Sequence, residues 1–160
     1  MSREAHEVPD AFRTRLHEVA VDVAMPTAPG LDDAIALGEE LLAAGLGGPE
    51  TLAVAALRKG SARSDVEQAV RAMLSAFGLD VPAAQDEAGR YRLVLWLFGH
   101  AGLAYRRFEG PFYARVLHQG RRGELERALL DLAGEQDRTS DSSVQLAIRE
   151  RMRAVVRQSI

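Results

Sequence analysis

Arginine and aromatic side chains, the residue types that dominate binding hot spots in protein interfaces, are concentrated in one stretch of this sequence. Residues 105–115 read YRRFEGPFYAR and hold three arginines and four aromatic residues. Arginine also binds carboxylates and phosphates in a planar fork geometry. The alternative interpretation is a connecting loop whose aromatic side chains fill the core while its arginines face water. We predict a partner-binding surface that consists of Tyr105, Arg106, Arg107, Phe108, Tyr113 and Arg115.

His100 is a second candidate, because it stands in the glycine-rich segment Gly99-His100-Ala101-Gly102. A glycine inside a helix costs about 1 kcal/mol relative to alanine, so these glycines indicate a close approach of the backbone to something else. One interpretation is a small ligand site that uses His100, Tyr105 and Arg106. The other is close packing between two helices.

Most other kinds of site lack the residues they need. The sequence has no cysteine, which excludes disulfides, thiolate metal sites and cysteine nucleophiles. None of its four histidines has a histidine partner at the i, i+4 spacing of a helical metal site. The segment GLGG at 45–48 lacks the Lys-Ser/Thr pair of a phosphate-binding loop. We therefore expect no metal, no cofactor and no catalytic residue, and we favour a protein that is not an enzyme.

Charge is distributed unevenly along the chain. Residues 1–89 hold 7 basic and 15 acidic residues, a net charge of −8, whereas residues 90–127 hold 8 arginines and 3 glutamates, a net charge of +5. This basic region predicts a partner with an acidic surface, or a weak homodimer in which the two regions pair across copies. Nucleic acid is not expected, because the net charge is −3 and no nucleic-acid-binding motif is present.

Apolar residues recur at spacings of three and four along most of the chain, which predicts an all-α fold, a compact bundle of seven or eight helices. The run LVLWLF at 93–98 leaves no polar face over nearly two turns, and a buried strand is the competing interpretation of these six residues. The apolar residues Tyr91, Ala101 and Tyr105 continue the helical spacing on both sides and favour a helix. We therefore place a helix over about 83–105 at the centre of the bundle, with Trp96 buried. At 160 residues the chain has the size of one domain. We predict a single helical domain over 1–160, with a flexible segment of ten residues at its N-terminus.

Several residues predict where helices begin and end. The segments LLAAGL at 41–46 and LSAFGL at 74–79 share a helix-end pattern of glycine followed by leucine. Gly45 is expected to end one helix in a left-handed conformation, and Gly78-Leu79 predicts a Schellman end for the other. Ser64 and Glu67 have the spacing of a capping box, which would begin another helix. Pro111 is expected in the first turn of a short helix, where its missing N–H is tolerated.

The segment DAIALGEELLAAGLGGPETLAVAAL at 33–57, followed by VEQAVRAMLSAFGLDVP at 66–82, resembles small all-helical bacterial proteins of unknown or immunity-type function. The resemblance covers about 50 residues, 33–82, and consists of helix-ending and helix-starting residues. It implies a helical protein that acts by binding another protein, and it assigns no binding residues.

Together these observations predict a non-enzymatic protein–protein interaction domain, such as an immunity or accessory factor of a bacterial system. The alternative is a small ligand-binding domain or enzyme with a pocket near His100, Tyr105 and Arg106. No apolar run approaches the roughly 20 residues that span a bilayer, and residues 1–10 do not have the pattern of a signal peptide. We therefore expect a cytoplasmic protein that does not bind membranes.

Overall fold

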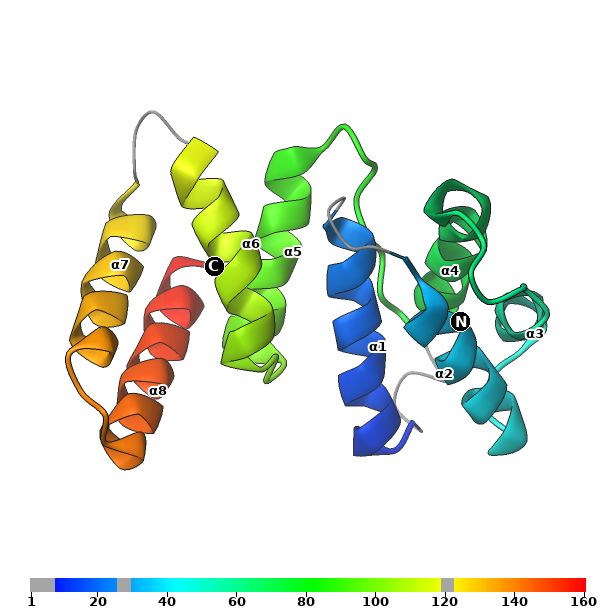
Figure 1. The fold of residues 1–160 in the computed structure, drawn as a ribbon, viewed down its shortest axis with the longest axis horizontal. Helices are drawn as coiled ribbons and strands as arrows, with labels where there is room; N and C mark the ends of the chain where they lie inside the picture. The colour runs from blue at the N-terminus through cyan, green and yellow to red at the C-terminus, as the bar shows by residue number, and fades with distance from the viewer. Residues whose placement is uncertain (1–7, 26–29, 119–122) are drawn as a thin grey trace. The chain divides into compact units, whose positions relative to one another are not determined.

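The computed structural model describes residues 8–25, 30–118 and 123–160. Over these residues the chain folds into eight α-helices and contains no strand (Figure 1). The helices are α1 (Asp10–Ala24), α2 (Asp32–Ala43), α3 (Pro49–Ala55), α4 (Arg63–Ala76), α5 (Glu87–His100), α6 (Tyr105–His118), α7 (Glu124–Asp137) and α8 (Ser142–Ser159). The predicted all-α fold with seven or eight helices is confirmed.

Contacts between residues divide the chain into two compact units, residues 1–90 and 91–160, with the boundary inside α5. We call them the N-terminal unit and the C-terminal unit. The first holds 8 basic and 15 acidic residues and the second 12 and 8, so their formal net charges are −7 and +4. A single domain over 1–160 stays a prediction. The first ten residues are predicted to be flexible, and residues 1–7 of this segment lie outside the described part of the chain.

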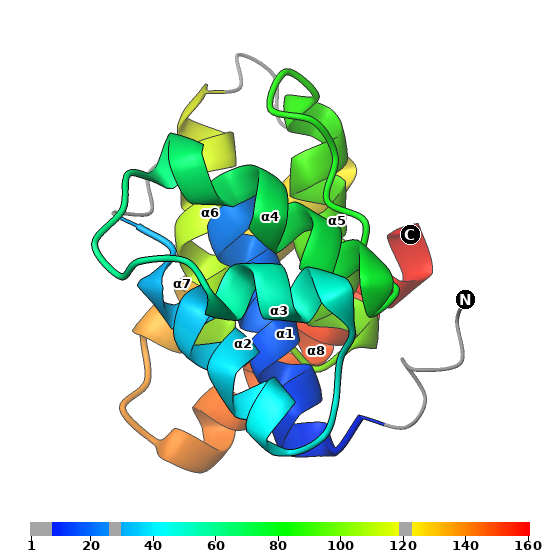
Figure 2. The same ribbon diagram turned by 90° about the vertical axis from the view of Figure 1, so that its right-hand side faces the viewer.

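In the N-terminal unit, α2 packs against α3 and α3 against α4, while α1 contacts both α2 and α4 (Figure 2). The side chains of Leu37, Val54, Val70 and Met73 are fully buried. Gly38 allows α2 to approach α3 closely, because a Cβ there would lie 3.2 Å from a methyl group of Val54. This close contact joins the shortest helix, α3, to the rest of the unit.

The predicted Schellman end of α4 and the predicted left-handed glycine at the end of α2 are confirmed, and α2 also ends in a Schellman motif. The N–H of Leu46 donates to the carbonyl of Leu41, and the N–H of Leu79 donates to the carbonyl of Leu74, both at 2.8 Å. The glycine before each of these donors has a positive φ, 74° in one case and 85° in the other. Glycine adopts this conformation without steric cost, so both helices end where the sequence indicates.

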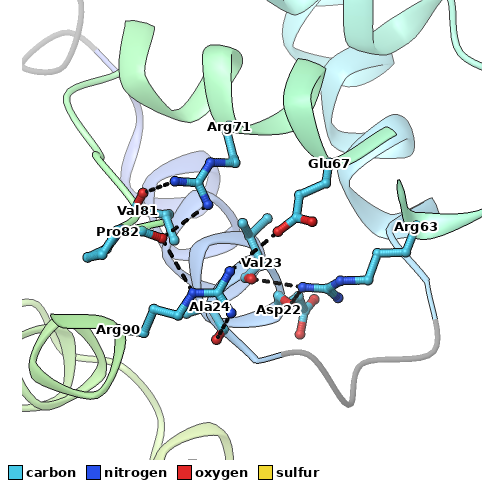
Figure 3. Close-up of polar contacts among 9 residues, drawn as sticks. All are labelled: Asp22, Val23, Ala24, Arg63, Glu67, Arg71, Val81, Pro82 and Arg90. Atoms are coloured by element: carbon cyan, nitrogen blue, oxygen red, sulfur yellow. Dashed lines mark hydrogen bonds and ion pairs between the residues drawn. The ribbon is translucent and has the colours of Figure 1, made fainter. Parts of the chain in front are cut away.

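Arginines from later helices close the C-terminal end of α1. The last four carbonyls of a helix have no intrahelical partner, and the last turn of α1 contains no basic residue. Arg63 donates through Nη2 to the carbonyls of Asp22 and Val23, both at 2.8 Å, and Arg90 donates through Nη1 to the carbonyl of Ala24 at 3.1 Å (Figure 3). Two positive charges therefore lie at the negative end of the helix dipole.

Arg90 also joins α1 to α4 and to the segment that precedes α5 (Figure 3). Its Nη2 lies 3.5 Å from Oε1 of Glu67, and its Nε donates to the carbonyl of Pro82 at 3.4 Å. Arg71 donates to the same carbonyl at 3.1 Å and to that of Val81 at 2.5 Å. Burial lowers the pKa of Arg90, while the nearby Glu67 carboxylate raises it. The guanidinium thus connects three parts of the N-terminal unit.

The predicted capping box of Ser64 and Glu67 is wrong. Helix α4 begins at Arg63 after Ala62, and no side chain caps its first turn. The carboxylate of Glu67 contacts Arg90 instead.

The C-terminal unit packs α7 against α8 and has an aromatic core on α5 and α6. The ring centroids of Phe98 and Phe108 lie 4.1 Å apart, and those of Phe108 and Phe112 lie 5.3 Å apart, in stacked arrangements. All three side chains are fully buried. Such pairs contribute about 0.5–1.5 kcal/mol each beyond their buried area.

The helix bounds in this unit differ from the predicted ones. Helix α5 ends at His100, short of the predicted 83–105, because Gly102 adopts a positive φ of 76° that terminates it. Pro111 lies inside α6 and does not begin a helix. A proline in a helix removes one backbone hydrogen bond, yet the stacked phenylalanines on both sides of it favour a continuous helix. Gly110 also lacks the Cβ that would clash with the proline ring.

His17 makes the stability of the N-terminal unit depend on pH. This residue of α1 is 9% exposed, and burial, followed by the nearby Arg13, lowers its pKa below the ordinary 6.5. The unfolded chain therefore binds a proton more readily than the folded chain as the pH falls below 6.5. We expect the urea concentration at the midpoint of unfolding to decrease as the pH is lowered below 6.5. The variant His17→Gln should show a smaller decrease over the same pH range. Equal slopes for the variant and the wild type would contradict this assignment.

Candidate functional site

Two aromatic members of the predicted partner-binding surface lie in the core of the C-terminal unit. Tyr105 is 7% exposed and Phe108 is 0% exposed. The ring of Tyr105 tilts against the rings of Phe98 and Phe108, with both centroid distances at 6.4 Å. These two side chains therefore pack the unit and do not contribute to an exposed surface.

The polar end of Tyr105 takes part in a network that links α6, α7 and α8. Its hydroxyl lies next to Gln136, and Arg149 donates through Nε to Oε1 of Gln136 at 2.7 Å. The Arg149 guanidinium also lies over the Tyr105 ring, 4.8 Å from its centroid. Burial raises the pKa of Tyr105 to about 12. Tyr105 stays protonated at neutral pH and acts as a structural residue.

The arginines of the predicted surface lie in different environments. Arg106 is exposed, whereas Arg107 is half-buried. The half-buried Arg115 lies over the ring of Tyr91 at 5.4 Å, and Tyr91 donates to Oε1 of Glu126 at 3.4 Å. Tyr113 is half-buried and lies next to Tyr105. The six predicted residues thus do not form one exposed surface, because some lie in the core, some are half-buried and one is exposed. Tyr105 and Phe108 fill the core, as the alternative interpretation of this stretch predicted for its aromatic side chains.

The glycine next to His100 serves helix packing. A Cβ on Gly99 would lie 2.8 Å from Cγ1 of Val156, so α8 crosses α5 at this point. His100 itself is exposed and stacks on Trp96, while Tyr105 faces the core. His100 and Tyr105 therefore do not converge on one site.

Two arginines of α8 close the C-terminal end of α5. Arg153 donates through Nη1 to the carbonyls of Phe98 at 2.6 Å and Leu103 at 2.9 Å, and its guanidinium lies 4.2 Å from the centroid of the Phe98 ring. Arg157 donates through Nη1 to the carbonyl of Gly99 at 3.0 Å. These bonds satisfy carbonyls that the helix leaves free, and they fix the end of α5 that carries His100.

The exposed aromatic residue of this unit is Trp96, and its predicted place in the core is wrong. Its side chain is 44% exposed and stacks on His100, with ring centroids 5.6 Å apart and an interplanar angle of 24°. Arg92, Trp96 and His100 follow one another at intervals of four residues, so they share one face of α5, and Arg157 reaches the same end of α5 through its bond to the carbonyl of Gly99. We call Arg92, Trp96, His100 and Arg157, all of them exposed, the Trp96 patch.

The Trp96 patch has a basic environment. The sequence has no acidic residue between Glu87 and Glu109, and none after Glu150 on α8. No ion pair is found for Arg92 among the residues that the structure describes. An indole flanked by arginines with no carboxylate nearby in the chain suits an acidic, partly apolar ligand.

Other kinds of site are not found in the part of the chain that the structure describes. There, no group of three or more His, Asp or Glu side chains lies close enough to hold a metal ion. Among the same residues, no helix has both the length and the hydropathy to cross a membrane.

Comparison with known proteins gives no relative: no family model, curated protein or solved structure matches this chain. The resemblance of residues 33–82 to small bacterial helical proteins therefore stays a prediction.

Proposed function

We propose that this chain is a non-enzymatic protein-binding module whose Trp96 patch binds an acidic surface of another protein. The observation that carries the proposal is the exposure of Trp96, 44%, within a basic surface of the C-terminal unit. The resemblance of residues 33–82 supports extending the proposal to an immunity or accessory protein of a bacterial system that acts in the cytoplasm.

The chemistry of the patch supports this type of partner. Tryptophan and arginine are enriched among residues whose truncation weakens protein complexes most. The indole offers apolar area to bury, and Arg92 offers a guanidinium that can form paired hydrogen bonds with a carboxylate. The pocket of the alternative function receives no such support, because His100 and Tyr105 do not converge.

The binding partner can be identified and tested with matched variants. We expect wild-type protein to capture a partner from an extract of its host, and Trp96→Ala with Arg92→Glu to lose that partner. Leu146→Ala is the control, because Leu146 is 60% exposed on α8 but lies outside the patch. With the purified partner, Trp96→Ala alone should raise Kd at least about tenfold, which corresponds to about 1.4 kcal/mol.

Salt provides a second readout of the same proposal. Affinity should fall as salt rises, because exposed charges are screened over a Debye length of about 10 Å at 0.1 M. Binding of the same partner by the folded double variant, with unchanged Kd, would contradict the proposal.

A further inference from the structure

We infer that a second copy of this chain also occupies the Trp96 patch: the acidic N-terminal unit of one copy binds the patch of another and competes with the acidic partner. The inference rests on the proposed function, because it uses the same patch. It adds that binding of the acidic partner to the patch decreases as the concentration of the protein itself rises.

The charges of the two units support this contact. The N-terminal unit carries −7 and the C-terminal unit +4, so unlike units of two copies attract and like units repel. The stretch 72–89 alone contains three acidic residues and no basic one. Exposed carboxylates occur on several segments of the N-terminal unit: Asp32, Asp33, Glu39, Glu40, Glu50, Asp65, Asp80, Asp86 and Glu87. Of these, Glu39 and Glu40 already form ion pairs with Lys59 and Arg15, so the other carboxylates provide most of the uncompensated negative charge.

The contact must join two different surfaces. Two patches facing each other would bring Arg92 and Arg157 of both copies together, which like-charge repulsion disfavours. Each copy therefore offers one patch and one acidic unit. Such a head-to-tail contact adds further copies unless it closes into a ring, so the mass should continue to rise with concentration.

Sedimentation of the full chain tests the inference. In about 0.05 M NaCl the wild type should show a mass that rises with protein concentration, and this rise should be lost in about 0.5 M NaCl. The variant Arg92→Glu with Trp96→Ala should remain a monomer, whereas the control Leu146→Ala should behave as the wild type. Circular dichroism of each variant confirms that it is folded.

A mixture distinguishes the head-to-tail contact from a patch-to-patch contact. The double variant lacks the patch but keeps its acidic unit, so a fluorescently labelled double variant should sediment faster when excess wild type is added. If the wild type associates but the labelled variant does not join it, the contact is patch to patch and the inference is overturned. A wild type that stays monomeric at low salt and high concentration also overturns it.

A synthetic peptide of glutamate and leucine residues separates this inference from the proposed function. The peptide should bind the wild type, bind the double variant at least tenfold more weakly, and dissociate the wild-type assemblies. If the wild type binds the peptide more tightly than the double variant does but never self-associates, the second-copy contact is refuted and the proposed function is kept. Equal binding by the wild type and the variant would refute both.

Discussion

Replacing Arg90 by methionine is expected to lower the free energy of unfolding of the N-terminal unit by about 3 kcal/mol. Arg90 is 6% exposed and donates hydrogen bonds to the carbonyls of Ala24 and Pro82. Its loss would leave the half-buried carboxylate of Glu67 without this ion pair and Ala24, at the end of α1, without this donor. Methionine keeps the aliphatic volume, so the expected change reports the guanidinium.

Two measurements and two further variants test this prediction. Urea unfolding gives the loss of stability, and hydrogen exchange of peptides from α1 shows that it arises at the end of this helix. Arg92→Met is the control on the same helix, and because Arg92 is exposed its effect should stay within about 0.5 kcal/mol. Adding Glu67→Met to Arg90→Met should recover part of the loss, since the half-buried carboxylate that lost its partner is then removed as well. Equal stabilities for the Arg90 and Arg92 variants would contradict the assignment.

The contacts of Arg90 also show why local patterns predicted some features and missed others. The Schellman ends of α2 and α4 depend on a glycine and on residues within one turn, so they can be predicted from sequence. The arginines that close α1 come from residues 41 and 66 positions away, and no local pattern indicates them. Glu67 had the spacing for a capping box, but its ion pair with Arg90 prevailed over that local arrangement.

The candidate site was missed for a related reason. The run at 93–98 has no polar face, so its amphipathicity does not show which side faces water, and Trp96 was predicted to be buried. The sequence held one usable signal, which is the spacing of Arg92, Trp96 and His100 on one helical face. Conversely, the arginine-aromatic stretch at 105–115 has the composition of an interface, but composition does not show that the rings of Phe108 and Phe112 stack in the core.

Replacing Gly99 by alanine is expected to lower the free energy of unfolding of the C-terminal unit by about 2 kcal/mol, although alanine is the better helix former. The added Cβ would lie 2.8 Å from Cγ1 and 3.2 Å from Cβ of Val156, so α8 must move away from α5. That movement would weaken the bonds from Arg153 and Arg157 that close α5.

Gly134→Ala is the matched control for this prediction, because Gly134 also lies inside a helix but its added Cβ would meet only the flexible end of Arg138, at 3.4 Å. The control should gain up to about 1 kcal/mol. Urea unfolding compares the two variants, and hydrogen exchange of peptides from α5 and α8 locates the change. If Gly99 instead admits a ligand or partner, Gly99→Ala will keep the wild-type stability and lose binding of the acidic peptide, which would refute the packing role.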